Sequence, residues 1–146
     1  MLRSILAAVV GYVALVLVVL AGIGVAWLAL GGAGAFDGEG PAPSTPWMAL
    51  NLLSGLIAAV VGGLVARRIG GSQLAVRILV GIVLVLGLVT AVMAGSAKGD
   101  REPLDKPVAE MSFQEAGQHA VQPAWYNWII PLVGAAGVLI GGRERS

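Results

Sequence analysis

Four long apolar runs constrain the fold of this chain more than any other feature. They predict helices over about residues 4–30, 46–66, 72–95 and 124–141, which together hold one charged residue, Arg77. Roughly 20 residues cross a 30 Å hydrocarbon core as an α-helix. Only 12% of the chain is charged, against about 25% in soluble domains. We therefore expect an all-α membrane protein: a four-transmembrane-helix bundle that forms a single domain, 1–146.

The first run has two interpretations. Ala33-Gly34-Ala35 has the small residues of a signal-peptide cleavage site, but signal-peptide apolar regions are about 7–15 residues long. This run, residues 5–30, has 26 residues, and 15 of them are Leu, Ile or Val. Each of these favours insertion by about 0.3–0.6 kcal/mol, so we expect a permanent membrane anchor.

The first two predicted helices are joined by a segment rich in Gly and Pro. Residues 31–45 contain no stretch that favours a regular element, and they predict an outer loop. Ser44 or Thr45 can cap the following helix, and Pro46 suits its first position.

Two further segments separate the remaining helices. Residues 67–71 predict a short basic turn, and residues 96–123 predict a longer outer loop. The part from 107 to 122 contains helix-compatible residues behind a candidate cap, Asp105, and predicts a short surface helix. Loops of this length are commonly functional or disordered, and 96–123 is the candidate segment for contact with another protein.

The basic residues predict the orientation of the bundle. An even number of spans puts both termini and the 67–71 turn on one face, which carries six basic residues, whereas the opposite face carries three. Cytoplasmic loops of membrane proteins are enriched in Lys and Arg. We therefore predict N- and C-termini in the cytoplasm. The six are Arg3, Arg67, Arg68, Arg77, Arg143 and Arg145; the three are Lys98, Arg101 and Lys106.

Aromatic residues gather near the predicted outer boundary, where amphipathic rings favour the headgroup layer. An aromatic belt explains them, although the segment from Trp125 to Trp128 could instead hold a lipid, a quinone or a partner helix. The interfacial aromatic residues are Trp27, Trp47, Trp125, Tyr126 and Trp128.

Small residues recur at four-residue spacing, which places them on one face of a helix. Such faces let two helix backbones approach closely in lipid. They predict either tight packing within this bundle or an interface with a second copy or another membrane protein. The residues are Ser54, Gly55, Ala58, Ala59, Gly62, Gly63, Ala66, Gly87, Ala91, Gly95, Gly137 and Gly141.

The polar groups inside the spans are uncharged, chiefly Asn51, Thr90 and Asn127. Ionisable residues in a membrane usually serve proton relays, ion pathways or substrates. Their absence from the central spans argues against a proton-coupled carrier or a voltage sensor. We expect Asn51 and Asn127 to form interhelical hydrogen bonds, with a ligand site as the alternative, and we expect Pro131 to kink the last helix.

The sequence offers no catalytic constellation. It lacks cysteine, has a single histidine, His119, and shows no nucleophile–base pair, phosphate-binding glycine loop or metal-ligand spacing. The formal net charge is +1, which predicts no nucleic-acid partner. We therefore expect no enzymatic activity, cofactor or metal.

Two segments carry a resemblance to a known group of proteins. The glycine-rich second helix ends in Gly-Gly-Leu-Val-Ala-Arg-Arg, and Gln122-Pro123-Ala124-Trp125 leads to Gly134-Ala135-Ala136-Gly137-Val138. With the short basic N-terminus, this pattern resembles small, uncharacterised four-helix proteins of the bacterial inner membrane. The resemblance implies that location and brings no known activity.

These observations predict a non-catalytic accessory or scaffold subunit. It would pack its small-residue helix faces against a membrane partner and present 96–123 outside. The alternative is a small oligomeric transporter or pore for a neutral or lipid-like solute, with a polar path through Asn51, Ser54, Thr90 and Asn127.

Overall fold

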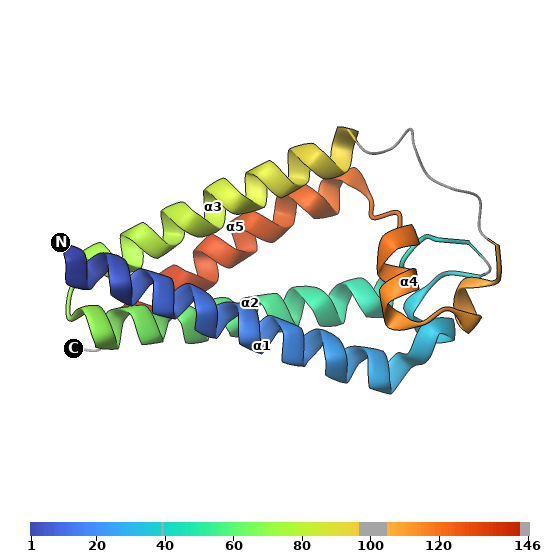
Figure 1. Cartoon of the computed structure of the whole chain (residues 1–146), viewed down its shortest axis with the longest axis horizontal. Helices are drawn as coiled ribbons and strands as arrows, with labels where there is room; N and C mark the ends of the chain where they lie inside the picture. Colours follow the sequence, from blue (N-terminus) through green and yellow to red (C-terminus); the bar gives the residue numbers. More distant parts are fainter. Residues whose placement is uncertain (39, 97–104, 144–146) are drawn as a thin grey trace.

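The computed structural model describes residues 1–38, 40–96 and 105–143, and within these ranges it contains helices and loops but no strand. Four helices are long and apolar enough to cross a membrane, which confirms this part of the prediction. They are α1 (Leu2–Ala35), α2 (Thr45–Gly70), α3 (Gln73–Ser96) and α5 (Ala124–Gly141) (Figure 1). Two short helices, η2 (Val108–Glu110) and α4 (Phe113–His119), complete the described part.

The bundle has two different ends. The start of α1, the end of α5 and the α2–α3 connection lie together at one end, the turn end (Figure 1). There the Ser4 and Ser72 hydroxyls are 3.3 Å apart, and Gln73 Nε2 donates a hydrogen bond to the Gly142 carbonyl over 3.2 Å. The α1–α2 loop and residues 105–123 lie at the other, the loop end.

Glycines bring α1 and α2 into backbone contact. A Cβ atom on Gly11 would lie 2.7 Å from the Gly62 carbonyl oxygen, and one on Gly62 would lie 2.8 Å from the Gly11 carbonyl oxygen. Nearer the loop end, a Cβ on Gly22 would lie 2.7 Å from the Ser54 Cβ. Small residues on both helices thus permit the close crossing.

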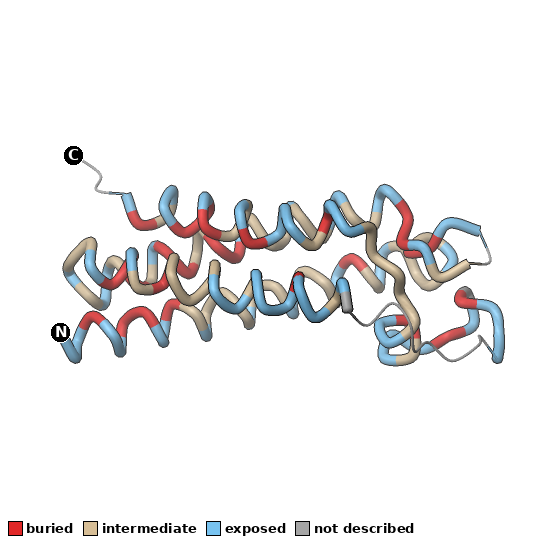
Figure 2. The backbone as a smooth tube through the Cα atoms, turned by 90° about the horizontal axis from the view of Figure 1, so that it is seen from above, coloured by how far each residue is buried: buried red, intermediate tan, exposed pale blue. Residues whose placement is uncertain are grey.

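A second row of small residues on α2 meets α5. A Cβ on Gly63 would overlap the Val138 carbonyl oxygen, and one on Gly141 would overlap the Val60 carbonyl oxygen. The hydrophobic core next to these contacts contains Leu79, Val76 and Val138, all fully buried. Buried residues therefore gather in the turn-end half of the helices and again at the loop end (Figure 2).

The end of α1 differs from the prediction. The expected helix end near residue 30 coincides with a break at Gly31 (φ 62°, ψ −178°), but the helix resumes and reaches Ala35. The predicted 31–45 loop therefore shrinks to 36–44. Ser44 N donates to the Ala35 carbonyl and Asp37 N to the Ala42 carbonyl, each over 2.9 Å. These bonds stabilise the end of α1 at Ala35 and the loop that follows it. The glycine content of residues 31–34 by itself would predict a loop there.

Ser44 is the N-cap of α2, and it is one of the two residues predicted for this position. Its Oγ accepts a hydrogen bond from Trp47 N over 3.3 Å, and Pro46 lies in the first turn. Ser44 Oγ also donates to the Gly34 carbonyl. One hydroxyl therefore joins the start of α2 to the end of α1.

The predicted 67–71 turn is also shorter in the structure. Arg67 and Arg68 belong to the last turn of α2, which ends at Gly70, and Gly71 (φ 65°) forms a left-handed cap. The Gly71 N–H donates to the Arg67 carbonyl over 2.9 Å. Basic side chains suit this position because the C-terminal end of a helix carries partial negative charge. The bounds of α3 and α5 lie within one residue of those predicted.

Residues 105–123 form a structure of their own at the loop end, which we call the cap. The N-cap of its helix α4 is Ser112 and not the predicted Asp105. Glu115 N donates to Ser112 Oγ over 3.4 Å, and Ser112 N donates to Glu115 Oε2 over 2.8 Å. This reciprocal pair, a capping box, satisfies two free backbone donors. An N-cap bonds amides two or three residues after itself, and in the sequence Asp105 precedes η2 and not α4. Val108, Met111 and Ala116 of the cap share a buried cluster with Phe36.

Candidate functional site

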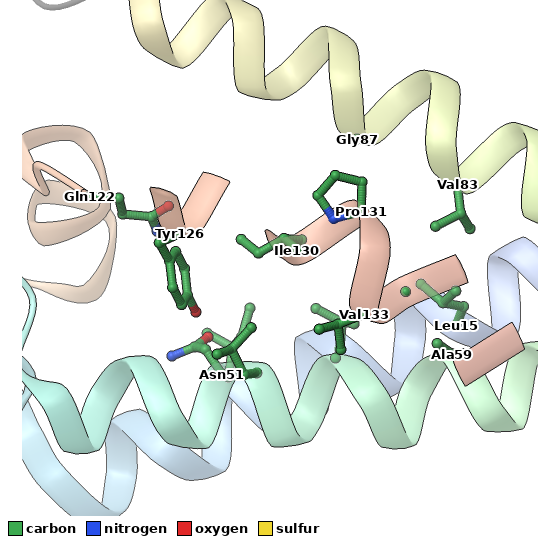
Figure 3. Close-up of a pocket in the computed structure, with 15 residues that line it drawn as sticks. Leu15, Asn51, Ala59, Val83, Gly87, Gln122, Tyr126, Ile130, Pro131 and Val133 are labelled. Carbon is green, nitrogen blue, oxygen red and sulfur yellow. The ribbon is translucent and has the colours of Figure 1, made fainter. Parts of the chain in front are cut away.

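A cavity of about 270 Å³ lies among the four long helices (Figure 3). It is partly open to its surroundings, and helices α1, α2, α3 and α5 all contribute to its wall. A cavity of roughly 150 Å³ already holds benzene, so this one has room for a larger apolar group. Its large aliphatic side chains are Leu15, Val19, Ile23, Leu52, Val83, Ile130 and Val133.

The arrangement of the helices explains the cavity. The α2 and α5 backbones touch at Gly63 and Val138, and from there the α1–α2 pair and the α3–α5 pair separate toward the loop end (Figure 1). Small residues leave the space between them unfilled. Gly55 lines the cavity, and a Cβ placed on it would meet nothing within 4 Å.

Three uncharged polar side chains lie on the loop-end side of this cavity: Asn51, Gln122 and Tyr126 (Figure 3). Tyr126 is only 3% exposed, and its hydroxyl donates a hydrogen bond to the Met48 carbonyl over 3.3 Å. Asn51 Nδ2 donates to the Trp47 carbonyl over 2.8 Å. All three groups keep unused hydrogen-bonding capacity.

Gln122 lies in the irregular segment between α4 and α5, and a backbone hydrogen bond next to it fixes the position of this segment. The preceding residue, Val121, donates its N–H to the Pro41 carbonyl over 2.9 Å. Pro41 belongs to the α1–α2 loop, so this bond ties the end of the cap to the other helix pair. Gln122 is thereby held at the boundary between the cap and the bundle.

The predicted interhelical hydrogen bonds of the asparagines are wrong for the described residues. Asn51 bonds the carbonyl four residues earlier in its own helix, and Thr90 Oγ1 does the same with the Leu86 carbonyl over 2.8 Å. Asn127 is half-buried and makes no hydrogen bond to another described helix. A carbonyl one turn back in the same helix is a local acceptor for such side chains, and Asn51 and Thr90 use it although Tyr126 and Gln122 line the same cavity as Asn51.

The four residues of the predicted polar path do not line one cavity within a single copy of the chain. Of its four residues, only Asn51 lines the cavity. Thr90 is exposed on α3, and Ser54 contacts Gly22 on α1. These residues lie on different faces of their helices, so they do not point into one space inside a single bundle. A path formed between several copies stays a prediction.

Most of the predicted small-residue faces make contacts inside the bundle. On α2, Gly62 contacts α1, and Gly63 contacts α5. The others divide into three groups. In the first group, Ser54 and Ala66 meet α1, and Ala58 on the same face of α2 is fully buried. In the second group, small residues join α5 to its neighbours: Gly137 and Gly141 meet α2, where Ala59 faces Gly137, and Gly87 of α3 meets Pro131. In the third group, Ala91 is buried, Gly95 is exposed and Gly55 borders the cavity.

The aromatic residues have two roles in the structure. Trp27 packs edge-on against Trp47, with ring centroids 5.9 Å apart, and against Phe113 of the cap at 5.4 Å. Trp125 and Trp128 are 53% and 49% exposed on α5. Two of the four tryptophans thus hold the cap, and the other two face outward, as an aromatic belt requires.

Sequence reasoning missed the inward position of Tyr126 and the role of Gln122. One signal was present: Trp125 and Trp128 are three residues apart and share a helix face, which turns Tyr126 away from them. Nothing comparable marks Gln122, because it lies in an irregular segment before α5.

The cavity is electrically neutral. None of the 15 residues that line it is charged, and the described residues contain no group of three or more His, Asp or Glu that could hold a metal ion. The described carboxylate with a shifted pKa, Glu115, belongs to the cap and not to the cavity wall; its Oε1 lies 2.9 Å from Lys106 Nζ. The cavity therefore offers apolar contacts and neutral hydrogen bonds.

Comparison of the chain with protein-family models, curated proteins and solved structures gives no match. The geometry of the cavity is accordingly the basis for the functional proposal below.

Proposed function

We propose that this protein binds an apolar, lipid-like molecule in the cavity between its two helix pairs, without catalysis or a cofactor. One observation carries the proposal: a cavity of about 270 Å³ with mainly apolar walls lies in a bundle in which α2 touches both α1 and α5 backbone to backbone. Empty space of this size is unfavourable because the wall atoms lose packing partners. A hydrocarbon chain supplies those partners, and the surrounding bilayer supplies the chain.

Two glycine substitutions test the proposal. Gly55 lines the cavity and Gly81 lies on α3 outside it, and a Cβ on either would meet nothing within 4 Å. Gly55→Leu therefore fills the cavity, and Gly81→Leu is the matched control. The probe is a hexadecane chain carrying a diazirine, added to the protein in nanodiscs and photolysed, with the labelled peptides mapped by mass spectrometry.

The proposal expects labelled cavity residues on α1, α2 and α5 in the unmodified protein and in Gly81→Leu. Gly55→Leu should lose this labelling and keep the labelling of outward-facing side chains. If the cavity wall is labelled as strongly in Gly55→Leu as in the unmodified protein, the hexadecane probe does not bind inside the cavity.

The orientation belongs to the same proposal: a bacterial inner-membrane protein with the turn end, including both termini, in the cytoplasm. Its support is the excess of arginine at that end, with Arg67 and Arg68 in the last turn of α2. The cysteine-free sequence permits a direct test. Asp105→Cys should react with an impermeant thiol reagent in intact cells and Ser72→Cys should not; the reverse pattern contradicts this orientation.

A second candidate function is a non-catalytic accessory subunit that packs against a membrane partner or a second copy. The bundle already uses most of its small-residue faces, so the outward side of α3 is the surface that favours this role. A shallow groove there runs beside Gly81, lined by Ile78, Ile82, Val85 and Leu86. Purification in mild detergent with mass spectrometry should recover a stoichiometric partner that Gly81→Leu loses and Gly55→Leu keeps. A bare monomer argues against this role.

A further inference from the structure

We infer that the bound molecule is an uncharged amphiphile with a hydroxyl head group, held by Asn51, Gln122 and Tyr126, with its chain directed toward the turn end. This inference rests on the proposed function, because it names the class of ligand for the same cavity. Three properties of the cavity lead to it: its hydrogen-bonding groups, its charge and the position of its polar side.

The hydrogen-bonding groups of the site both donate and accept. Asn51 uses one N–H for the Trp47 carbonyl, and Tyr126 uses its O–H for the Met48 carbonyl. What remains is the second N–H and the carbonyl oxygen of Asn51, the phenol oxygen of Tyr126 and the whole amide of Gln122. A hydroxyl group is the smallest head that uses donors and acceptors together.

The charge of the site excludes ionic head groups. No lining residue is charged, so a carboxylate or phosphate would leave water without a cation beside it, and an ammonium group without an anion. Burying an unpaired charge is strongly unfavourable. A hydroxyl group avoids this cost and still bonds the amides.

The polar groups lie on one side only, which gives the ligand a direction. Asn51 and Tyr126 belong to the loop-end portions of α2 and α5 (Figure 3). The rest of the wall is apolar and includes Leu15, Ala59 and Val83. An amphiphile in a bilayer likewise places its head near the interface and its chain toward the centre, so the cavity accepts it without reorientation.

The test compares three probes that share a hexadecyl chain and a diazirine at the same carbon: the alcohol, the sulfate and the plain hydrocarbon. Each is incorporated into nanodiscs at the same mole fraction and photolysed. We expect the alcohol to label the cavity wall about threefold to tenfold more than the hydrocarbon, since each neutral hydrogen bond contributes modestly to binding. The sulfate should label least.

Substitutions connect the preference to the named side chains. In the double variant Asn51→Leu with Gln122→Leu, only the Tyr126 oxygen remains to bind the hydroxyl group, so the alcohol should lose most of its advantage over the hydrocarbon, while the hydrocarbon labelling stays. Gln122 lies outside the helices, so the single variant Gln122→Leu should fold even if the double variant does not. It should reduce the threefold to tenfold preference for the alcohol only in part. Thr90→Val is the matched control, because Thr90 lies outside the cavity.

The outcomes separate the two proposals. Equal labelling by alcohol and sulfate, or an alcohol preference that is undiminished in both Gln122→Leu and the double variant, overturns the hydroxyl assignment even if Gly55→Leu still abolishes cavity labelling. If Gly55→Leu leaves the labelling by every probe unchanged, the proposed cavity binding itself is wrong, and the hydroxyl assignment falls with it.

Discussion

The hydroxyl of Tyr126 on α5 donates a hydrogen bond over 3.3 Å to the backbone carbonyl of Met48 on α2. At the turn end the same two helices touch through Gly63 and Val138. The bond thus joins the two helix pairs at the end where the cavity separates them. It also keeps the Tyr126 ring on the cavity wall.

Tyr126→Phe should lower the free energy of unfolding by about 0.5–1.5 kcal/mol, the net contribution of one neutral hydrogen bond. The Met48 carbonyl lies inside α2 and keeps its backbone hydrogen bond within that helix. We therefore expect no further penalty for an unsatisfied carbonyl. Steric trapping in bicelles measures the change. Tyr12→Phe is the control, since the Tyr12 hydroxyl bonds no described residue; an equal loss in both variants would contradict the role of the bond.

Gly63→Ala should destabilise the bundle by about 1–3 kcal/mol, a typical cost of overpacking. Its new Cβ would overlap the Val138 carbonyl oxygen, so α2 and α5 must move apart. Gly55→Ala should instead gain up to about 1 kcal/mol from helix propensity, because nothing lies within 4 Å of its Cβ. The same unfolding assay compares the two, and a similar effect of both would refute the close contact at Gly63.

Ser44→Ala should cost about 0.5–2 kcal/mol through loss of the helix cap. Ser44 Oγ accepts from Trp47 N over 3.3 Å and donates to the Gly34 carbonyl, so the loss reaches two helix ends. Hydrogen exchange should rise at the first amides of α2. Thr45→Ala, at the adjacent exposed position, should leave that exchange nearly unchanged. A larger effect of Thr45→Ala than of Ser44→Ala would identify Thr45 as the N-cap residue of α2 instead.

Acid should loosen the cap. The backbone hydrogen bond from Ser112 and then the side-chain hydrogen bond from Lys106 lower the pKa of Glu115 from 4.5 to about 2. The ionised carboxylate therefore stabilises folded α4 fully above pH 4.5, and this stabilisation is lost as the pH falls toward the folded-state pKa.

Hydrogen exchange in Phe113–His119, corrected for the intrinsic pH dependence, measures this loss. Protection should fall between pH 4.5 and about 2. Glu115→Gln lacks the titrating group, so its protection should be lower at neutral pH and flat across this range. A pH-dependent loss of the same size in Glu115→Gln would assign the effect to another group.

The sequence alone determined the number of long helices and most of their bounds. In a bilayer the backbone has to satisfy its own hydrogen bonds, so an apolar run of sufficient length predicts a helix whatever surrounds it. α5, Ala124–Gly141, matches its predicted bounds for this reason. Local chemistry also identified Ser44 as one of two possible caps, because an N-cap depends on residues within one turn.

Only the tertiary structure decided which helices the small residues join and where they leave space. Gly62 and Gly63 are neighbours in sequence, yet one contacts α1 and the other α5, and no local pattern names these partners. Asn51 and Gln122 likewise reach one cavity from distant parts of the chain. Periodicity gives the face of each helix, but the cavity depends on how the helices cross, and close contacts between distant residues set those crossings.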